Sequence, residues 1–185
     1  MATVGIDLGT TNSLVSVWQD DKCTLIPNNL GEYLTPSVVG IDENGEMLVG
    51  KTAKERLISH PESTVASFKR FMGTEKTFML GNRQFTAADL SSMVLRQLKE
   101  DAEKYLGEPV EEAVISVPAY FNDFREMRRR WQESLPDLLW SVWSMSRRRQ
   151  HLPIALERRR RIRPFWCLTL AEELWISRSW MHLAV

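Results

Sequence analysis

An aspartate, a glycine and two threonines lie close together near the start of the chain, at Asp7, Gly9, Thr10 and Thr11. Three successive backbone N–H groups, from Gly9 to Thr11, form an anion-binding nest if they converge, and the two threonine hydroxyls add donors at the same place. Asp7 is suited to hold a magnesium ion through water, because Mg²⁺ keeps much of its hydration shell and takes few carboxylates. These residues predict a site for a nucleotide phosphate. The alternative is an ordinary hairpin turn with a solvated Asp7.

The elements on either side of these residues are two strands. Residues 4–8 form an apolar run typical of a buried strand, and the alternating residues 14–18 predict a second strand. Gly9 between them allows a tight turn that residues with a Cβ resist. The sequence therefore predicts a hairpin with a polar tip.

The string Gly-Ile-Asp-Leu-Gly-Thr-Thr-Asn-Ser, residues 5–13, resembles the first phosphate loop of the DnaK-type heat-shock chaperones. This family lies within the superfamily of actin, sugar kinases and chaperone ATPases. The string is not a Walker A loop, because no Gly-Lys-Ser/Thr follows and the next element is a strand rather than a helix. The resemblance implies an α/β fold, the incomplete first lobe of an actin-like (ribonuclease H-like) ATPase. It also implies ATP and Mg²⁺ as cofactors, and it adds Asn12 to the phosphate-binding residues.

A second matching segment is Phe-Lys-Arg-Phe, residues 68–71. In the family a lysine of this segment reaches the terminal phosphate, so the resemblance assigns that catalytic role to Lys69. A flexible ammonium suits this task, since it can follow the charge that develops on a transferring phosphoryl group. Without the resemblance, Lys69 would be read as a solvated surface cation, because lysine is rarely buried.

The resemblance is continuous over residues 3–123. The wording Ile-Pro-Asn (26–28) and Gly-Glu-Tyr-Leu-Thr-Pro-Ser (31–37) resembles most the specialised HscC-like branch. Between the matching segments, residues 51–59 predict a short helix, and residues 77–80 and 83–85 predict a hairpin. Thr86 to Asp89 predicts a capping box that opens a helix to Leu106, where Gly107 and Pro109 provide the stop. A strand over residues 112–118 leads into a Val-Pro-Ala-Tyr-Phe segment. In the family the proline of this segment, here Pro118, couples the nucleotide state to the peptide-binding domain. A proline that merely ends a strand is the compatible simpler interpretation.

The composition divides the chain near Phe124. Residues 124–185 hold 13 Arg, no Lys, 6 acidic residues and six of the seven Trp, whereas residues 1–123 hold 7 Lys and 4 Arg against 18 acidic residues. We interpret residues 1–123 as the N-terminal lobe of a DnaK-type nucleotide-binding domain, with a small α/β subdomain over about residues 35–106. Residues 124–185 form an Arg/Trp-rich tail without resemblance to the family, which we expect to be irregular or partly helical and to pack poorly.

Three interpretations of the tail compete. In the first, arginines with interleaved tryptophans bind nucleic acid or an anionic membrane. In the second, they form a solvated basic face. The third interpretation is translation in a shifted frame. Codons for residues 145–154, read one base earlier, can encode Asn-Glu-Pro-Thr-Ala-Ala-Ala-Leu-Ala-Tyr, the family's catalytic-glutamate segment. Codons for residues 164–185 in the same frame can encode its second phosphate loop, Asp-Leu-Gly-Gly-Gly-Thr. Two motifs in the correct order favour a base lost near codon 124.

The resemblance implies a chaperone ATPase whose partners are unfolded client peptides, a J-domain co-chaperone and a nucleotide exchange factor. Because the visible frame lacks the second phosphate loop and the catalytic glutamate, we expect this chain to bind MgATP weakly or not at all, and to hydrolyse none. The alternatives are a sugar or metabolite kinase of the same superfamily, or a nucleic-acid-binding protein that uses the tail. No leader or membrane-span pattern is present, so we expect a cytoplasmic location and neither membrane nor nucleic acid as a partner.

Overall fold

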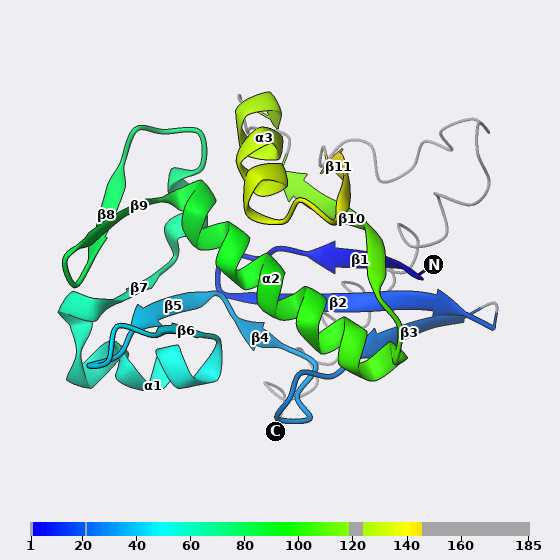
Figure 1. The fold of residues 1–185 in the computed structure, drawn as a ribbon, viewed down its shortest axis with the longest axis horizontal. Helices are drawn as coiled ribbons and strands as arrows, with labels where there is room; N and C mark the ends of the chain where they lie inside the picture. Colours follow the sequence, from blue (N-terminus) through cyan, green and yellow to red (C-terminus); the bar gives the residue numbers. More distant parts are fainter. Residues whose placement is uncertain (1, 21, 119–123, 146–185) are drawn as a thin grey trace, which may run out of the picture.

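The computed structural model describes residues 2–20, 22–118 and 124–145 of the 185-residue chain. Outside this part lie residues 119–123, and residues 146–154 and 164–185, whose codons can encode the two family motifs in the shifted frame. The described residues form an α/β structure whose larger and smaller sheets are shown in Figure 1. This architecture confirms the predicted fold class.

The larger sheet carries the predicted hairpin at its centre. Its first three strands form an antiparallel meander, and the last two strands run parallel to the first. Val4 and Ile6 are fully buried, as expected for the apolar strand predicted there. The strand order is β11 (Leu139–Met145), β10 (Val110–Pro118), β1 (Ala2–Asp7), β2 (Asn12–Gln19) and β3 (Lys22–Ile26), and the short β4 (Thr35–Pro36) also pairs with β2.

A smaller part follows β4 in the sequence and lies beside the larger sheet, at the left of Figure 1. It has a three-stranded sheet with the order β6, β5, β7, and a separate hairpin formed by β8 and β9. The helix α1 covers the residues predicted as helical. The bounds are β5 (Val38–Ile41), β6 (Met47–Val49), α1 (Lys51–Ser59), the 3-10 helix η1 (Pro61–Ser63), β7 (Thr64–Ala66), the 3-10 helix η2 (Phe68–Phe71), β8 (Thr77–Leu80) and β9 (Arg83–Thr86).

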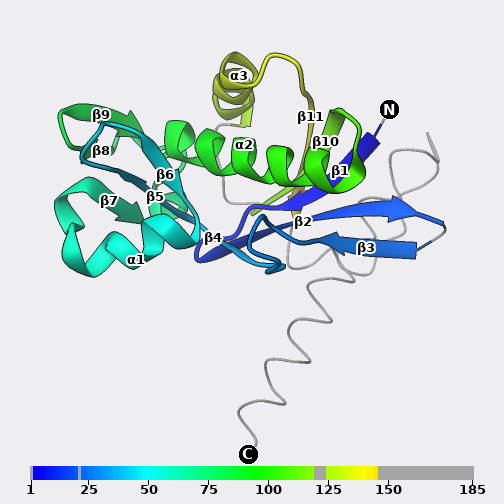
Figure 2. The same ribbon diagram turned by 60° about the horizontal axis from the view of Figure 1, so that its bottom comes forward.

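The long helix α2 (Ala87–Leu106) lies across one face of the larger sheet, as Figures 1 and 2 show. The predicted capping box is confirmed. Thr86 Oγ1 accepts a hydrogen bond from the Asp89 N–H at 3.2 Å, and the Asp89 carboxylate accepts one from the Thr86 N–H at 2.8 Å. Gly107 ends the helix with a φ of 70°, a left-handed conformation that glycine adopts without a steric penalty.

Residues beyond Asp123 also join the fold. The helix α3 (Phe124–Ser134) crosses from β10 to β11, which is a parallel edge strand of the larger sheet. Trp131 and Leu138 are fully buried, and Leu135 is 8% exposed. The Arg96 guanidinium donates to the Ser134 carbonyl at 2.8 Å, at the end of the helix. The expectation that the tail would pack poorly is therefore wrong for residues 131–138, because Trp131, Leu135 and Leu138 are buried in the core cluster.

One large apolar cluster connects most of these elements. The buried residues of β1, β2 and β10 form one cluster with those of α2, with Phe68 and Met72 of the smaller part, and with Trp131. Among the described residues, the longest helix is too polar to cross a membrane.

Candidate functional site

The candidate site begins at the turn between β1 and β2. A Cβ on Gly9 would overlap the backbone carbonyl oxygen of Asn12. Glycine is therefore required here by this close approach of two backbone segments, and not by a left-handed conformation, because the φ of Gly9 is not positive. The tight turn predicted at Gly9 is present, and it leaves no room for a side chain at this position.

Two buried serines, Ser13 and Ser37, form hydrogen bonds with the backbone of the turn. Ser37 Oγ donates to the Gly9 carbonyl at 2.8 Å and lies 2.9 Å from Ser13 Oγ. The Gly9 N–H donates to Ser13 Oγ at 3.2 Å, and the Ser37 N–H donates to the Thr11 carbonyl at 2.8 Å. Of the three N–H groups predicted to form the anion nest, that of Gly9 is thus engaged by a protein hydroxyl.

The two threonines stand at the tip of the turn. Thr11 is exposed and Thr10 is half-buried. Within residues 2–20, 22–118 and 124–145, the N–H groups and hydroxyls of Thr10 and Thr11 donate to no protein acceptor. A polar tip with several available donors is the chemistry that an anionic oxygen requires.

Asp7 ends β1 next to this turn. It is in register with Ser116 of the neighbouring strand β10, and Ser116 Oγ donates to Asp7 Oδ1 at 2.8 Å. The hydrogen bond fixes the orientation of a carboxylate that is only partly buried. Among the described residues no cluster of three or more His, Cys, Asp or Glu side chains is present. The donor set therefore fits Mg²⁺ held by one carboxylate through water, since Mg²⁺ keeps most of its hydration shell.

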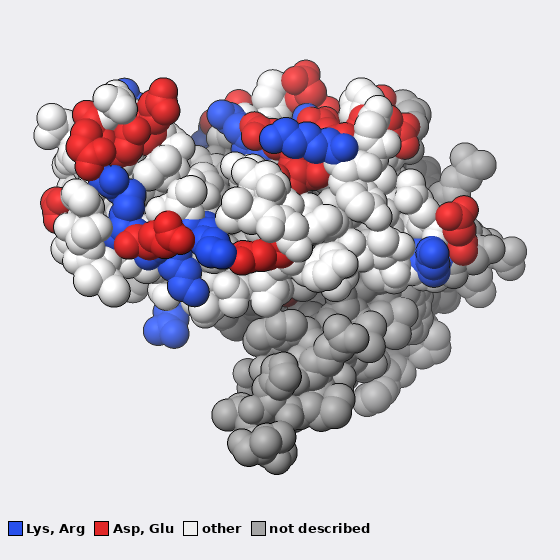
Figure 3. Space-filling view, turned by 90° about the horizontal axis from the view of Figure 1, so that it is seen from below, with Lys and Arg blue, Asp and Glu red and all other residues white. Residues whose placement is uncertain are grey.

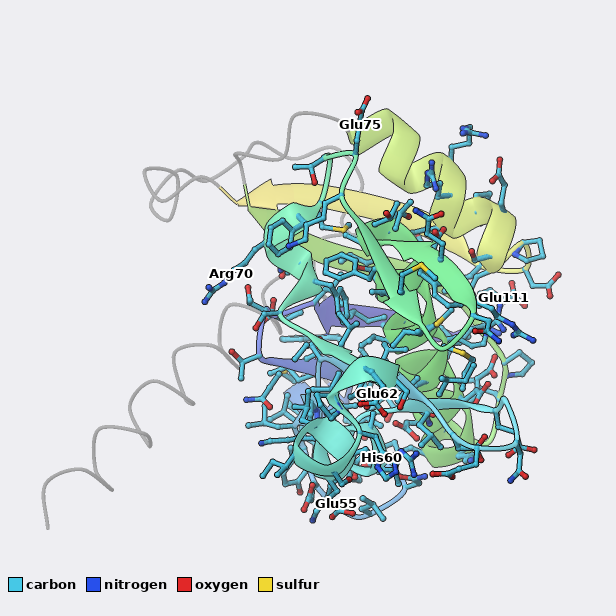
Figure 4. The ribbon with its side chains drawn as sticks, turned by 90° about the vertical axis from the view of Figure 1, so that its left-hand side faces the viewer. Glu55, His60, Glu62, Arg70, Glu75 and Glu111 are labelled. Carbon is cyan, nitrogen blue, oxygen red and sulfur yellow. The ribbon has the colours of Figure 1, made fainter. Side chains whose placement is uncertain are left out.

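Lys69 reaches the same place from the smaller part of the fold. It lies in η2 and is 7% exposed, and its Nζ donates to the backbone carbonyl of Leu8, the residue before Gly9. The adjacent Arg70 is exposed and points away from the fold in Figure 4. The structure thus places Lys69 beside the turn and not on the surface. A buried ammonium at this position contributes positive charge next to the polar tip of the turn.

The two remaining predicted residues, Asn12 and Pro118, lie at the end of the larger sheet that carries the turn at Gly9. Asn12 begins β2 and is in register with Pro36 of β4. Pro118 is the last residue of β10, two positions beyond Ser116, and is in register with Met145 of β11. Asp7, Gly9, Thr10, Thr11, Asn12 and Lys69 are therefore brought together, whereas Pro118 lies further along the sheet.

Three serines of this site were not among the predicted site residues: Ser13, Ser37 and Ser116. The matching string includes Ser13, and the Thr-Pro-Ser run that resembles the family's next segment includes Ser37. Each matching string thus includes the serine, but neither string predicts which backbone groups the serine contacts. For Ser116 the only available signal was the pairing of two apolar strands, and the register of β1 against β10 cannot be read from one sequence.

The face of the molecule seen in Figure 3 carries charges of both signs. On the face seen in Figure 3, Lys and Arg side chains are interspersed with Asp and Glu. Ion pairs at Lys51–Glu32 (2.6 Å) and Arg56–Glu43 (2.7 Å) connect parts of the fold that lie apart in the sequence. The hydrogen bond from Arg56 lowers the pKa of the exposed Glu43 carboxyl.

The meander, the parallel strands and the polar turn between β1 and β2 define the first lobe of an actin-like ATPase. The family model described as Hsp70 protein matches residues 3–80 and 75–130. The chain belongs to the Hsp70 family. The match extends seven residues beyond the end of our sequence comparison at residue 123, and so includes more than half of α3.

Proposed function

We propose that this chain is the N-terminal part of an Hsp70-type ATPase domain, that it retains a weak site for the phosphates of MgATP, and that it hydrolyses none. The observation that carries the proposal is the convergence of Asp7, Lys69 and the Thr10–Thr11 tip on one turn. In the family, ATP binding and hydrolysis drive the folding of client proteins.

Each residue has a separate role in this proposal. The backbone N–H groups of residues 10–12 and the threonine hydroxyls bind the phosphate oxygens, while Asp7 orients a water of the hydrated Mg²⁺. Lys69 stabilises the terminal phosphoryl group through its charge. Pro118 transmits the nucleotide state towards a peptide-binding domain. The bound Mg²⁺ would supply charge neutralisation of the phosphates.

The absence of turnover follows from the visible sequence. A family member closes a second lobe, a second glycine-rich loop and a catalytic glutamate over the nucleotide. Residues 146–185 do not encode these motifs in the visible frame, although a frame one base earlier can encode both. A base lost near codon 124 accounts for both observations. Translation of an out-of-frame segment would also account for 13 Arg without a Lys in residues 124–185.

The partners of the proposed protein are those of its family: client peptides, a J-domain co-chaperone and a nucleotide exchange factor, acting in the cytoplasm. We do not expect this chain to work productively with these partners, since residues 146–185 do not carry the second phosphate loop or the catalytic glutamate in the visible frame. The interspersed charges on the face seen in Figure 3 give no support to a nucleic-acid partner there.

Two experiments test the proposal. Titration calorimetry and phosphate-release assays on the full chain should give ATP affinity weaker than micromolar and no turnover. Micromolar affinity, or turnover that disappears in Lys69→Ala, would contradict it. Sequencing of the gene across codons 124–185 should reveal the codons that encode the hidden motifs, and unrelated codons would exclude the shifted frame.

A further inference from the structure

Ser37 occupies the crossing point between the two parts of the fold. It lies between β4, which pairs with the larger sheet, and β5, which belongs to the smaller sheet. Its side chain is 1% exposed. From this position it binds the phosphate-loop turn twice: Oγ donates to the Gly9 carbonyl at 2.8 Å, and the backbone N–H donates to the Thr11 carbonyl at 2.8 Å.

These two hydrogen bonds fix two alternate peptide planes. In a planar trans peptide, the carbonyl and the following N–H point in opposite directions. A Gly9 carbonyl held towards Ser37 therefore turns the Thr10 N–H away from Ser37. A Thr11 carbonyl held towards Ser37 likewise turns the Asn12 N–H away. The two donors consequently face the same side of the turn, opposite to the serine.

The neighbouring hydroxyl completes the arrangement. Ser13 is fully buried, and its Oγ accepts from the Gly9 N–H at 3.2 Å and lies 2.9 Å from Ser37 Oγ. The Gly9 peptide group is thus bound through its N–H by one serine and through its carbonyl by the other. A closed network of hydrogen bonds in a buried site is stronger than isolated bonds and resists rotation of the peptide.

We propose that Ser37 is the positioning residue of the phosphate loop, which aims the N–H groups of Thr10 and Asn12 at a magnesium polyphosphate. This role rests on the proposed function. The recognised group is the polyphosphate itself, because both aimed donors are backbone N–H groups of the turn. The anion nest predicted at Gly9, Thr10 and Thr11 is thereby reassigned to Thr10 and Asn12.

The test uses the full ¹⁵N-labelled chain and magnesium tripolyphosphate as the probe, followed by amide NMR at millimolar ligand. Ser37→Ala should weaken binding about fivefold, the effect of losing one hydrogen bond. It should also shift the amide resonances of Thr10 and Asn12 before any ligand is added. The matched control is Ser91→Ala, because Ser91 is fully buried and donates to the Ala87 carbonyl at 2.8 Å, far from the turn in sequence.

The control variant should bind the probe as the wild-type chain does. Equal weakening by both alanine variants would overturn the proposal, since it would indicate a general loss of stability. Wild-type affinity and unchanged amide resonances in Ser37→Ala would overturn it as well. If the wild-type chain does not bind the probe, the proposed function and the ligand-binding role of Ser37 both fail, while the resonances of the unliganded variant still decide whether Ser37 orients the turn.

Discussion

The ammonium of Lys69 is hydrogen-bonded to the carbonyl oxygen of Leu8, although 61 residues separate them in the sequence. Leu8 is 1% exposed and directly precedes the turn at Gly9. The contact therefore joins η2, in the smaller part of the fold, to the end of β1 in the larger sheet. It keeps a positive charge beside the turn before any nucleotide is present.

Lys69→Met tests the contribution of this charge. The methionine keeps an unbranched apolar side chain in the buried position but removes the ammonium, so affinity for magnesium tripolyphosphate should fall about tenfold, as expected for a charged hydrogen bond. Arg70→Met is the matched control, because Arg70 is exposed and points away from the fold. Amide NMR titration measures both variants. Equal affinities would show that the Lys69 charge does not act on the phosphates.

Trp131→Ala tests whether α3 is part of the stable fold. Trp131 is fully buried in the common core, so its loss should lower the free energy of unfolding by about 3–5 kcal/mol. Leu139→Ala, at a residue 66% exposed, should change the free energy of unfolding by less than about 0.5 kcal/mol. Urea denaturation of the full chain measures both. A Trp131→Ala variant as stable as the wild type would show that residues 124–145 contribute little to the core.

Asp101 predicts a dependence of stability on pH. The residue is 3% exposed on α2, and its Oδ2 has no hydrogen-bond partner within the described part of the chain. Burial raises the pKa of the Asp101 carboxyl, and the hydrogen bond from Gln97 at 3.2 Å opposes this shift only in part. The unfolded chain thus loses the proton at a lower pH than the folded chain, and stability falls as pH rises above about 4.

Asp101→Asn removes this ionisation. At pH 7 the variant should be more stable than the wild type by about 1 kcal/mol, because burial disfavours the charged form of Asp101 and the amide carries no charge. The difference should vanish below about pH 4, where the wild-type carboxyl is protonated in both states. Thermal unfolding at several pH values provides the measurement, with Glu75→Gln, at an exposed carboxylate outside α2, as the control. A stability gain that does not change with pH would contradict the stated cause.

Gly9→Ala tests the steric basis of the turn. The new Cβ would overlap the Asn12 carbonyl, and neither atom belongs to a flexible side-chain end, so the backbone must move. We expect a loss of about 1–3 kcal/mol in unfolding free energy and the loss of detectable tripolyphosphate binding. Thr11→Ala, at an exposed residue, should retain the stability of the wild type. A Gly9→Ala variant with unchanged amide resonances in residues 8–13 would show that the turn tolerates a side chain.

Local signals accounted for much of the fold. The bounds of α1 and the capping box at Thr86 and Asp89 agree with the sequence, because helix starts and stops depend on residues that are neighbours in the chain. The β8–β9 hairpin agrees for the same reason. The 3-10 helix η1 and the strand β7 were not predicted, since each is only three residues long and depends on its neighbours in the fold.

The contacts within the candidate site could not be predicted from the sequence, because they depend on how separate elements pack together. The resemblance identified Lys69, but its contact with Leu8 depends on how η2 approaches β1. The Arg-rich composition of residues 124–145 concealed the apolar spacing of Trp131, Leu135 and Leu138, which packs onto a core made by other elements. Charge composition describes the solvent side of such a segment and does not predict its buried side.

Ser37, at the crossing point between the two parts of the fold, binds the carbonyl of Gly9, and Lys69, in the smaller part, binds the carbonyl of Leu8. A rotation of the smaller part as a rigid unit would therefore pull on both carbonyls together. If the turn binds an anion as proposed, thermodynamic linkage requires that whatever strengthens these two contacts also raises the affinity for the anion, and that the bound anion strengthens the contacts to the same extent in free energy. The turn would thus couple anion binding to the position of the smaller part relative to the larger sheet.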